Sequence, residues 1–191
     1  MSSNGSGIPY AAECLYTETE VAACLDRMAG EIEVEVGGHD PLILCVMTGA
    51  IPVTAALMLR LPFPLQLDYV HATRYRGELR GGELEWLHKP ETGLRDRIVL
   101  LVDDILDEGE TLAGIRDWCL EQGASRVLTA VLVDKQHERR CARLRQADFT
   151  GLMTPDRFLV GYGMDYQSYG RNAPGIYALT VADSEPVQDS S

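Results

Sequence analysis

The sequence has 191 residues, with 29 acidic residues, 17 basic residues and a formal net charge of -12. This length predicts a single domain with one sizeable core, and the negative charge disfavours nucleic acids and anionic membranes as partners. The five cysteines are odd in number and widely spaced, so they indicate reduced thiols and neither a disulfide framework nor a zinc site. Because no signal peptide and no apolar stretch of bilayer length is recognisable, we expect a cytoplasmic protein.

Alternating helices and strands are predicted along most of the chain. Thr17 and Glu20 form a capping box that begins a helix over about 18–30. In chain order, the next elements are expected to be a strand at 42–46, a helix at 51–60, strands at 65–72, 84–88 and 98–102, a helix at 111–122 and a strand at 127–133. This alternation predicts a parallel sheet with right-handed crossovers. Around the strand at 84–88, the irregular segment 73–97 is interpreted as a hairpin-like flap.

The strand at 98–102 has no polar face and is followed by two adjacent acids, Asp103 and Asp104. Such a strand is typical of the middle of a parallel sheet, and ligands of α/β sheets bind beyond the carboxyl ends of strands. The two carboxylates are therefore candidates for binding ribose hydroxyls or magnesium. The turn at 107–111 begins the next helix and offers backbone N–H groups to a phosphate. The alternative is that Asp103 and Asp104 are ordinary loop acids and that Asp107, Glu108 and Glu110 only complement a helix dipole.

Residues 99–111 resemble the phosphoribosyl pyrophosphate (PRPP) signature of the type I phosphoribosyltransferases. The shared pattern is a hydrophobic strand, two acids, two hydrophobic residues, an Asp, a short stretch with Gly, and a Thr. Two later features resemble the hypoxanthine-guanine enzymes of this family. These are Lys135, about thirty positions after the acids, and the run 155–166 followed by Arg171.

The resemblance covers residues 42–179 and implies the α/β fold of type I phosphoribosyltransferases. This fold has a central parallel sheet flanked by helices, a small hood and a mobile flap. Residues 1–191 would form a single domain. We expect its core at about 35–150, its hood from the N-terminal segment and about 151–180, and its flap at about 73–97.

The resemblance also implies a role for each matching residue. Asp103 and Asp104 would bind the ribose hydroxyls of PRPP and magnesium, and Asp107 would be the general base near N7 of the purine. The residues at the 5′-phosphate would be Asp107, Glu108, Gly109, Glu110 and Thr111. The purine would be bound by Lys135, Phe158, Leu159 and Asp165, and Asp165 would also bind a second magnesium ion. Pyrophosphate would be bound by Thr48, Gly49 and Arg171, and the flap would contribute Arg74 and Tyr75.

Simple chemistry supports three of these roles. A cationic donor such as Lys135 at a strand end favours a 6-oxopurine over a 6-aminopurine, and hence hypoxanthine or guanine over adenine. Phe158 would stack on the flat base. Negative charge on the departing pyrophosphate would be stabilised by magnesium and Arg171.

Two segments depart from the family pattern. Many relatives have a Lys in the short pyrophosphate loop, whereas residues 47–50 read Met-Thr-Gly-Ala. The Met47–Thr48 peptide bond is the candidate for a cis bond that is frequent in this loop. In the flap, Tyr75 is the expected lid tyrosine, and Arg74 or Arg76 could compensate for the missing Lys.

The implied activity is magnesium-dependent transfer of 5-phosphoribosyl from PRPP to hypoxanthine or guanine in purine salvage, giving IMP or GMP and pyrophosphate. Two alternatives stay open: a xanthine-guanine-preferring enzyme and a non-catalytic nucleotide-sensing regulator of the same fold. A phosphate-receiver domain is disfavoured because its acid pair comes early in the chain. The expected partners are PRPP, a 6-oxopurine base, pyrophosphate and further copies in a homodimer or homotetramer, with neither nucleic acid nor membrane.

Two groups of charged or titratable residues receive no positive role. Glu108 and Glu110 fit beside a phosphate only if their side chains point outward while the backbone amides face in. The four histidines have no metal-binding spacing and are assigned no function. They are His39, His71, His88 and His137.

Overall fold

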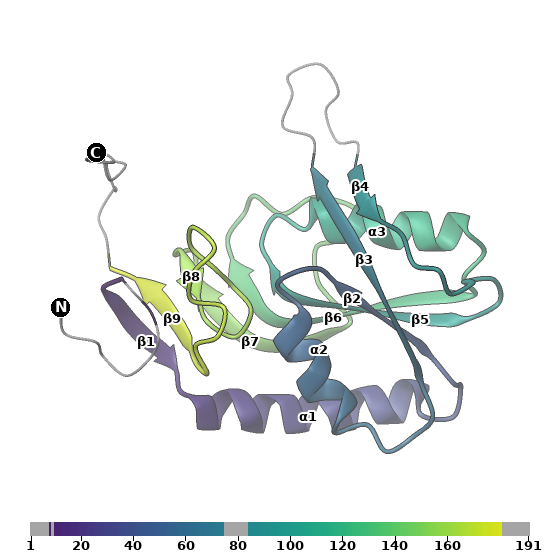
Figure 1. Ribbon diagram of the computed structural model, residues 1–191, viewed down its shortest axis with the longest axis horizontal. Coiled ribbons are helices and arrows are strands. Elements are labelled where there is room, and N and C mark those ends of the chain that lie inside the picture. Colours follow the sequence, from purple (N-terminus) through teal and green to yellow (C-terminus); the bar gives the residue numbers. More distant parts are fainter. Residues whose placement is uncertain (1–7, 9, 75–83, 181–191) are drawn as a thin grey trace.

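Two sheets organise the chain in the computed structural model, which describes residue 8, residues 10–74 and residues 84–180. Within these residues the large sheet has six strands, in the order β4-β3-β2-β5-β6-β7, and the small sheet has three, in the order β1-β9-β8 (Figure 1). The large sheet contains β2 (Leu42–Val46), β3 (Gln66–Arg74), β4 (Leu84–His88), β5 (Ile98–Leu106), β6 (Arg126–Gln136) and β7 (Phe149–Pro155). The small sheet contains β1 (Ala12–Tyr16), β8 (Leu159–Val160) and β9 (Ile176–Leu179). The helices are α1 (Glu18–Val36), α2 (Ile51–Met58) and α3 (Glu110–Glu121).

The order of the large sheet creates a switch point between β2 and β5. Strands β3, β2, β5, β6 and β7 are parallel, and β4 adds an antiparallel edge. The chain moves from β2 to β3 through α2 and, in the opposite direction across the sheet, from β5 to β6 through α3. Because such crossovers are right-handed, α2 and α3 lie on opposite faces. Helix α1 packs on α2 and β7, and α3 packs on β5 and β6. Ligands of α/β sheets bind at the carboxyl ends of strands at such a point.

The core lies between the large sheet and its helices. All five residues of β2 are buried, and the four residues 99–102 of β5 have no exposed surface. On α1 the buried face includes Leu25, Met28 and Ile32, at helical spacing. Burial of each such side chain contributes about 1.5–3 kcal/mol to folding. The two strands that meet at the switch point are therefore held in the most buried part of the molecule.

The predicted elements are present in the predicted type and order, although several of their ends differ and the sequence analysis did not predict strands β1, β7, β8 and β9. The capping box is present, with Thr17 N–H donating to Glu20 Oε2 at 2.8 Å. Helix α1 continues beyond residue 30 because its buried face continues to Val36. Strand β5 continues to Leu106, so Asp103 pairs with Val131 of β6 inside the sheet, where the sequence suggested a loop.

The small sheet joins the two ends of the described chain. Strand β1 pairs antiparallel with β9, which pairs antiparallel with β8. The hydroxyl of Tyr16 donates to the carbonyl of Met153 at 2.6 Å and so ties β1 to the end of β7. We call β1, β8, β9 and residues 161–175 the hood.

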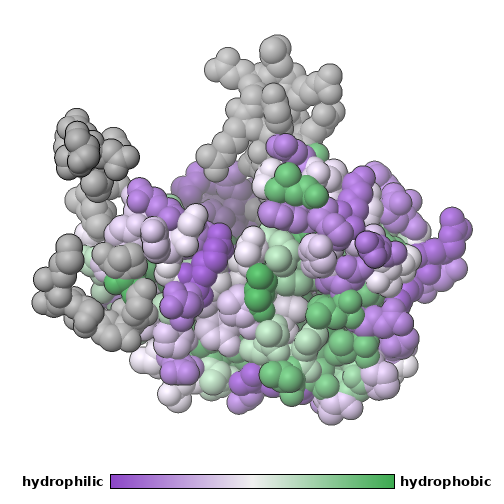
Figure 2. All heavy atoms as spheres, viewed as in Figure 1, coloured by the Kyte–Doolittle hydropathy of each residue, from purple (hydrophilic) through white to green (hydrophobic). Residues whose placement is uncertain are grey.

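Hydrophobic residues also reach the surface. On the face shown in Figure 2 they gather over the end of α2 and the first part of β3, where Leu59 and Leu67 are exposed. Among the described residues, no helix combines the length and apolarity needed to span a membrane.

Candidate active site

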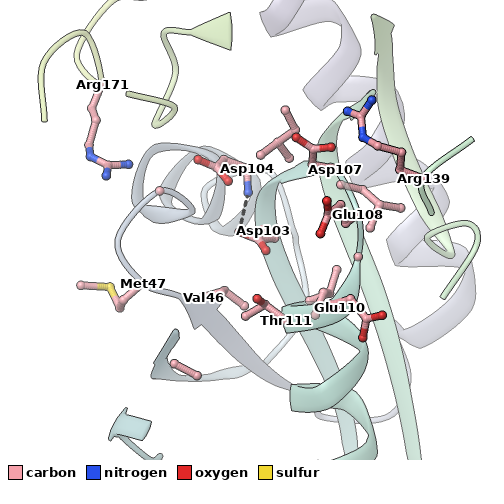
Figure 3. Close-up of a pocket in the computed structure, with 16 residues that line it drawn as sticks. Val46, Met47, Asp103, Asp104, Asp107, Glu108, Glu110, Thr111, Arg139 and Arg171 are labelled. Carbon is pink, nitrogen blue, oxygen red and sulfur yellow. Dashed lines mark hydrogen bonds between the residues drawn. The ribbon is translucent and has the colours of Figure 1, made fainter. Parts of the chain in front are cut away.

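Two adjoining cavities open at the carboxyl end of the large sheet. The larger has a volume of about 450 Å³, and its lining includes Met47, Gly49, Asp103, Asp104, residues 107–111, Arg139 and Arg171 (Figure 3). The smaller, of about 190 Å³, is lined by Asp104, Ile105, Asp107, Lys135, Phe158, Leu159, Met164 and Asp165. Asp104, Ile105 and Asp107 belong to both linings, so they lie where the two cavities meet.

The structure brings most of the predicted site residues together. Every residue predicted to bind the ribose or the 5′-phosphate lines the larger cavity, as do Gly49 and Arg171. All four residues predicted to bind the purine line the smaller one. Thr48 is exposed and lies outside both linings. The side chain of Arg74, at the end of β3, and residues 75 and 76 lie outside the described part of the molecule, so the lid prediction stays a prediction.

The turn that begins α3 has the features of an anion site. Gly109 precedes the helix with a φ of 80°, and a Cβ there would lie 3.1 Å from both a Leu106 methyl group and the Leu144 carbonyl oxygen. This backbone conformation and this crowding favour glycine. No side chain caps the first turn of the twelve-residue helix, so its backbone N–H groups are available to a phosphate.

The charge of Glu110 is compensated by a neighbouring arginine. Arg143 donates to Glu110 Oε2 at 2.6 Å and to Asp117 Oδ2 at 3.0 Å. In Figure 3 the Glu110 carboxylate points away from Asp103 and Asp104. This orientation agrees with the expectation for Glu110. Glu108 is exposed, and its carbonyl oxygen accepts a hydrogen bond of 2.8 Å from the Cys141 N–H.

Asp103 and Asp104 form a pair of carboxylates at the switch point. The backbone N–H of Asp104 donates to Asp103 Oδ1 at 3.0 Å (Figure 3). Burial raises the pKa of Asp103 well above its ordinary value, and repulsion from Asp104 adds to the rise. Burial also raises the pKa of Asp104, against the lowering effect of its hydrogen bond with Asp103 and of the charge on Arg171. The pair therefore carries unfavourable charge that a bound cation would relieve.

The donor set fits magnesium bound together with a substrate. Within residues 8, 10–74 and 84–180, no three His, Cys, Asp or Glu side chains form a group that could hold a metal ion. Magnesium is usually bound by one or two carboxylates, waters and substrate phosphates, and rarely by a cage of protein ligands alone. Asp103 and Asp104 supply such a carboxylate pair.

The hood docks directly on the loop that follows β2. Gly163 has a φ of 106°, and a Cβ there would lie 1.9 Å from the Gly49 carbonyl oxygen, so only glycine fits. The Met47–Thr48 bond in this loop, which the sequence marked as the candidate for a cis bond, is cis. Arg171 donates to the Gly163 carbonyl at 2.5 Å, and in Figure 3 it extends toward Asp104. The loop and the hood thus meet over the carboxylate pair.

Asp165 has partners that the sequence did not predict. Its Oδ1 pairs with Arg171 at 2.5 Å, and its Oδ2 accepts from the Ser168 N–H at 2.8 Å. A metal ion at Asp165 would therefore compete with Arg171 for the carboxylate.

Both oxygens of Asp107 accept hydrogen bonds. Lys135 Nζ lies 2.7 Å from Oδ2, and His137 Nε2 lies 2.6 Å from Oδ1. Burial pushes the pKa of Asp107 upward, but the hydrogen bond and charge of Lys135, together with the hydrogen bond of His137, outweigh it and lower the pKa. Asp107 is therefore held as a carboxylate, the form that a general base requires.

Two residues at the site were missed by the sequence analysis. His137, which was assigned no role, contacts Asp107, and Arg139 lines the larger cavity and donates to both oxygens of Asp156 at 2.7 and 3.0 Å. The available signal was the alternation of side chains along β6. His137 follows Lys135 by two residues, and such residues on an extended chain point to the same side.

The smaller cavity offers an aromatic surface. Phe158 is 54% exposed, and its ring meets that of Tyr166 edge to face, with centroids 5.0 Å apart. Leu159, beside it, is buried in β8. A flat ligand in this cavity could therefore stack on Phe158 without displacing the core.

Comparison with known proteins gives a consistent result. The family model described as "Phosphoribosyl transferase domain" matches residues 12–167. The chain is 30% identical over 166 residues to a hypoxanthine-guanine phosphoribosyltransferase of Streptococcus thermophilus, covering 86% of this chain and 91% of the relative. It is 32% identical over 166 residues to a Bifunctional protein TilS/HprT of Listeria innocua, but spans only 25% of that longer protein. A hypoxanthine phosphoribosyltransferase structure from Staphylococcus aureus superposes with a TM-score of 0.84 and 26% identity, covering 94% of this chain and 97% of that one.

The chain belongs to the phosphoribosyl transferase family, and it is a transferase. The predicted α/β fold of the type I enzymes, with a central, mostly parallel sheet flanked by helices, is confirmed.

Proposed function

We propose that this transferase acts in purine salvage and transfers the 5-phosphoribosyl group of PRPP to hypoxanthine or guanine. The products would be IMP or GMP and pyrophosphate. The names of the relatives that match over most of both chains support this substrate class. The observation that carries the proposal is the position of Asp107, at the junction of a cavity with a phosphate-binding turn and a cavity with an aromatic surface and a lysine.

PRPP would bind in the larger cavity. The turn 107–111 would hold the 5′-phosphate, and Asp103 and Asp104 would accept hydrogen bonds from the ribose hydroxyls. Magnesium, with Asp103 and Asp104 as its protein ligands, would neutralise charge on the leaving pyrophosphate. Arg171, which is already fixed by the hood, would add a second positive charge on that side.

The purine would bind in the smaller cavity, stacked on Phe158. As N9 of the base attacks C1 of the ribose, the bond from C1 to the pyrophosphate oxygen breaks, and the proton on N7 passes to Asp107. Lys135 has three donor hydrogens, so it can keep its bond to Asp107 and still donate to a 6-oxo group. A 6-amino group offers no such acceptor, which disfavours adenine.

One assay tests the proposal. Purified protein, magnesium and PRPP are supplied with hypoxanthine, guanine, xanthine or adenine in turn, and nucleotide formation is measured. We expect turnover with hypoxanthine or guanine and a loss of about 10²–10⁴ in kcat in Asp107→Asn. Conversion of adenine alone, or of no base, would refute the proposal, and a clear preference for xanthine and guanine would establish the xanthine-guanine alternative.

The chain is also expected to form a homodimer or homotetramer. The hydrophobic residues over α2 and β3 are the candidate contact surface, because exposed apolar patches commonly mark interfaces. Light scattering with Leu59→Glu tests this surface, and an unchanged mass would exclude it. A cytoplasmic location, without a nucleic acid or membrane partner, stays a prediction that cell fractionation can check.

A further inference from the structure

We infer that His137 is a positioning residue for Asp107: it holds the carboxylate in place while Lys135 shares its hydrogen bonds between Asp107 and the purine. This inference rests on the proposed function, in which Asp107 receives the N7 proton. The imidazole is 4% exposed, and its Nε2 lies 2.6 Å from Asp107 Oδ1.

The hydrogen bonds of His137 determine its tautomer. The backbone N–H of Arg139 donates to His137 Nδ1 at 3.1 Å, so Nδ1 uses its lone pair and carries no proton. The proton of the neutral ring is therefore on Nε2, from which it is donated to Asp107. A ring held in this way is a fixed hydrogen-bond donor and needs no positive charge.

Lys135 and His137, which both donate to Asp107, differ in their other contacts. Lys135 Nζ also lies 3.8 Å from Asp156 Oδ1 and lines the cavity where the purine would bind, so in the proposed function it donates to the base as well as to Asp107. The smaller cavity is not lined by His137, which contacts Asp107 and lines a separate cavity with Asp134 and Arg140. The bond from His137 can therefore persist throughout the reaction and prevent rotation of the carboxylate.

The pKa of Asp107 depends on the charged groups around it. Lys135 on β6 and His137 and Arg139 after β6 interact with Asp107, Asp156 lies beyond Lys135, and Asp104 and Asp165 line the smaller cavity together with Asp107. Burial opposes ionisation of Asp107, and Lys135 and His137 together lower its pKa below the ordinary value. Removal of one donor should therefore move the acid limb of the pH–rate profile to higher pH.

A purely structural role for His137 can be separated from positioning. The segment after β6 is anchored independently of the imidazole, since Arg140 donates to Asp134 and to the Lys135 carbonyl, each at 2.7 Å. The Cys141 N–H also donates to the Glu108 carbonyl at 2.8 Å. Substitution of His137 should thus leave this segment folded.

The test compares His137→Leu with His137→Gln, because the Gln amide can place a donor near the position of Nε2. The exposed His39→Leu is the matched control. We expect His137→Leu to lower kcat about 10-fold with an unchanged KM for PRPP, as for loss of one hydrogen bond to a charged group. Its acid limb should move up by about one pH unit, and His137→Gln should restore most of both values.

Wild-type kcat and an unchanged pH profile in His137→Leu would overturn the inference, as would equal losses in the Leu and Gln variants. A second readout does not need turnover. The ¹⁵N spectrum of the free wild-type protein should show protonated Nε2 and unprotonated Nδ1 for His137, perturbed in Asp107→Ala. An unperturbed resonance would refute the contact, whereas an inactive wild type with the expected spectrum would refute the proposed function alone.

Discussion

Gly49→Ala should displace Asp104 from the carboxylate pair. A Cβ at position 49 would lie 2.0 Å from Oδ2, 2.6 Å from Cγ and 3.0 Å from Oδ1 of Asp104. Real Cβ atoms do not approach other atoms this closely, so the carboxylate must move. Gly49 is not among the glycines with positive φ, and the substitution therefore adds no backbone strain of that kind. Any effect of Gly49→Ala on stability or binding can therefore be attributed to the clash with Asp104.

The expected effects of Gly49→Ala on stability and on PRPP binding follow from overpacking and from the displacement of Asp104. Forcing extra atoms into a packed site costs about 1–3 kcal/mol, and we expect the free energy of unfolding to fall by about 2 kcal/mol in urea titrations. In the proposed function, a displaced Asp104 would no longer accept from the ribose, and loss of such a charged hydrogen bond should raise the KM for PRPP about 10-fold or more. Steady-state kinetics with varied PRPP measure this change.

Two control variants test whether the clash with Asp104 causes the effect of Gly49→Ala. Gly30, in α1, has no atom within 4 Å of an added Cβ, so Gly30→Ala should stabilise the helix by about 0.5–1 kcal/mol and leave the KM unchanged. In an Asp104→Ala background the clash is absent, and Gly49→Ala should then cost little stability. If Gly49→Ala destabilises both backgrounds equally, or binds PRPP normally, the steric argument is wrong.

Three further predictions concern single contacts. Because Asp107 has a lowered pKa, its carboxylate stabilises the fold above its ordinary pKa, and this is lost as the pH falls through the lowered value; the unfolding free energy of the wild type relative to Asp107→Asn should therefore decline below about pH 4. Phe158→Ala should raise the KM for the base about 10-fold, and leave that for PRPP unchanged, because stacking on an aromatic ring contributes about 1–3 kcal/mol per base. Arg143→Gln should leave Glu110 uncompensated near the phosphate turn and raise the KM for PRPP about 3-fold, with Glu110→Gln restoring it. A normal KM in the Arg143 variant would show that Glu110 does not influence the phosphate.

Hydrophobic periodicity predicted the three helices and strands β2 to β6 but not all of their ends, and it did not predict strands β1, β7, β8 and β9. Strand β2 was located to the residue because all five of its side chains are buried and apolar. Strand β6 was expected to end at residue 133 because a polar Asp134 follows. In the structure it runs to Gln136, since pairing with β7 continues through Lys135 and Thr154. The length of a strand depends on the partner beside it, which local composition does not report.

The site residues likewise differ in whether the local sequence could predict them. Asp103, Asp104 and Asp107 could be predicted because they occupy one short segment with a recognisable pattern. The contact between Asp107 and His137 joins residues thirty positions apart, each of which directly follows one of two neighbouring strands. A lone histidine in a sequence is more often a structural residue, and only the parallel register of β5 and β6 brings it to the carboxylate proposed as the general base.

The loop after β2 shows how the fold can supply a charge that its sequence lacks. Residues 47–50 contain no cation, yet the hood places the Arg171 guanidinium beside this loop. The guanidinium is fixed by the Gly163 carbonyl and by Asp165, and Gly163 itself contacts the Gly49 carbonyl oxygen too closely for any side chain. Since a preorganised cation loses little conformational entropy when an anion binds, Arg171 would bind pyrophosphate in the proposed function without a lysine in the loop. In that function the docking of the hood on Gly49 would position the guanidinium as well as pack the hood against the sheet.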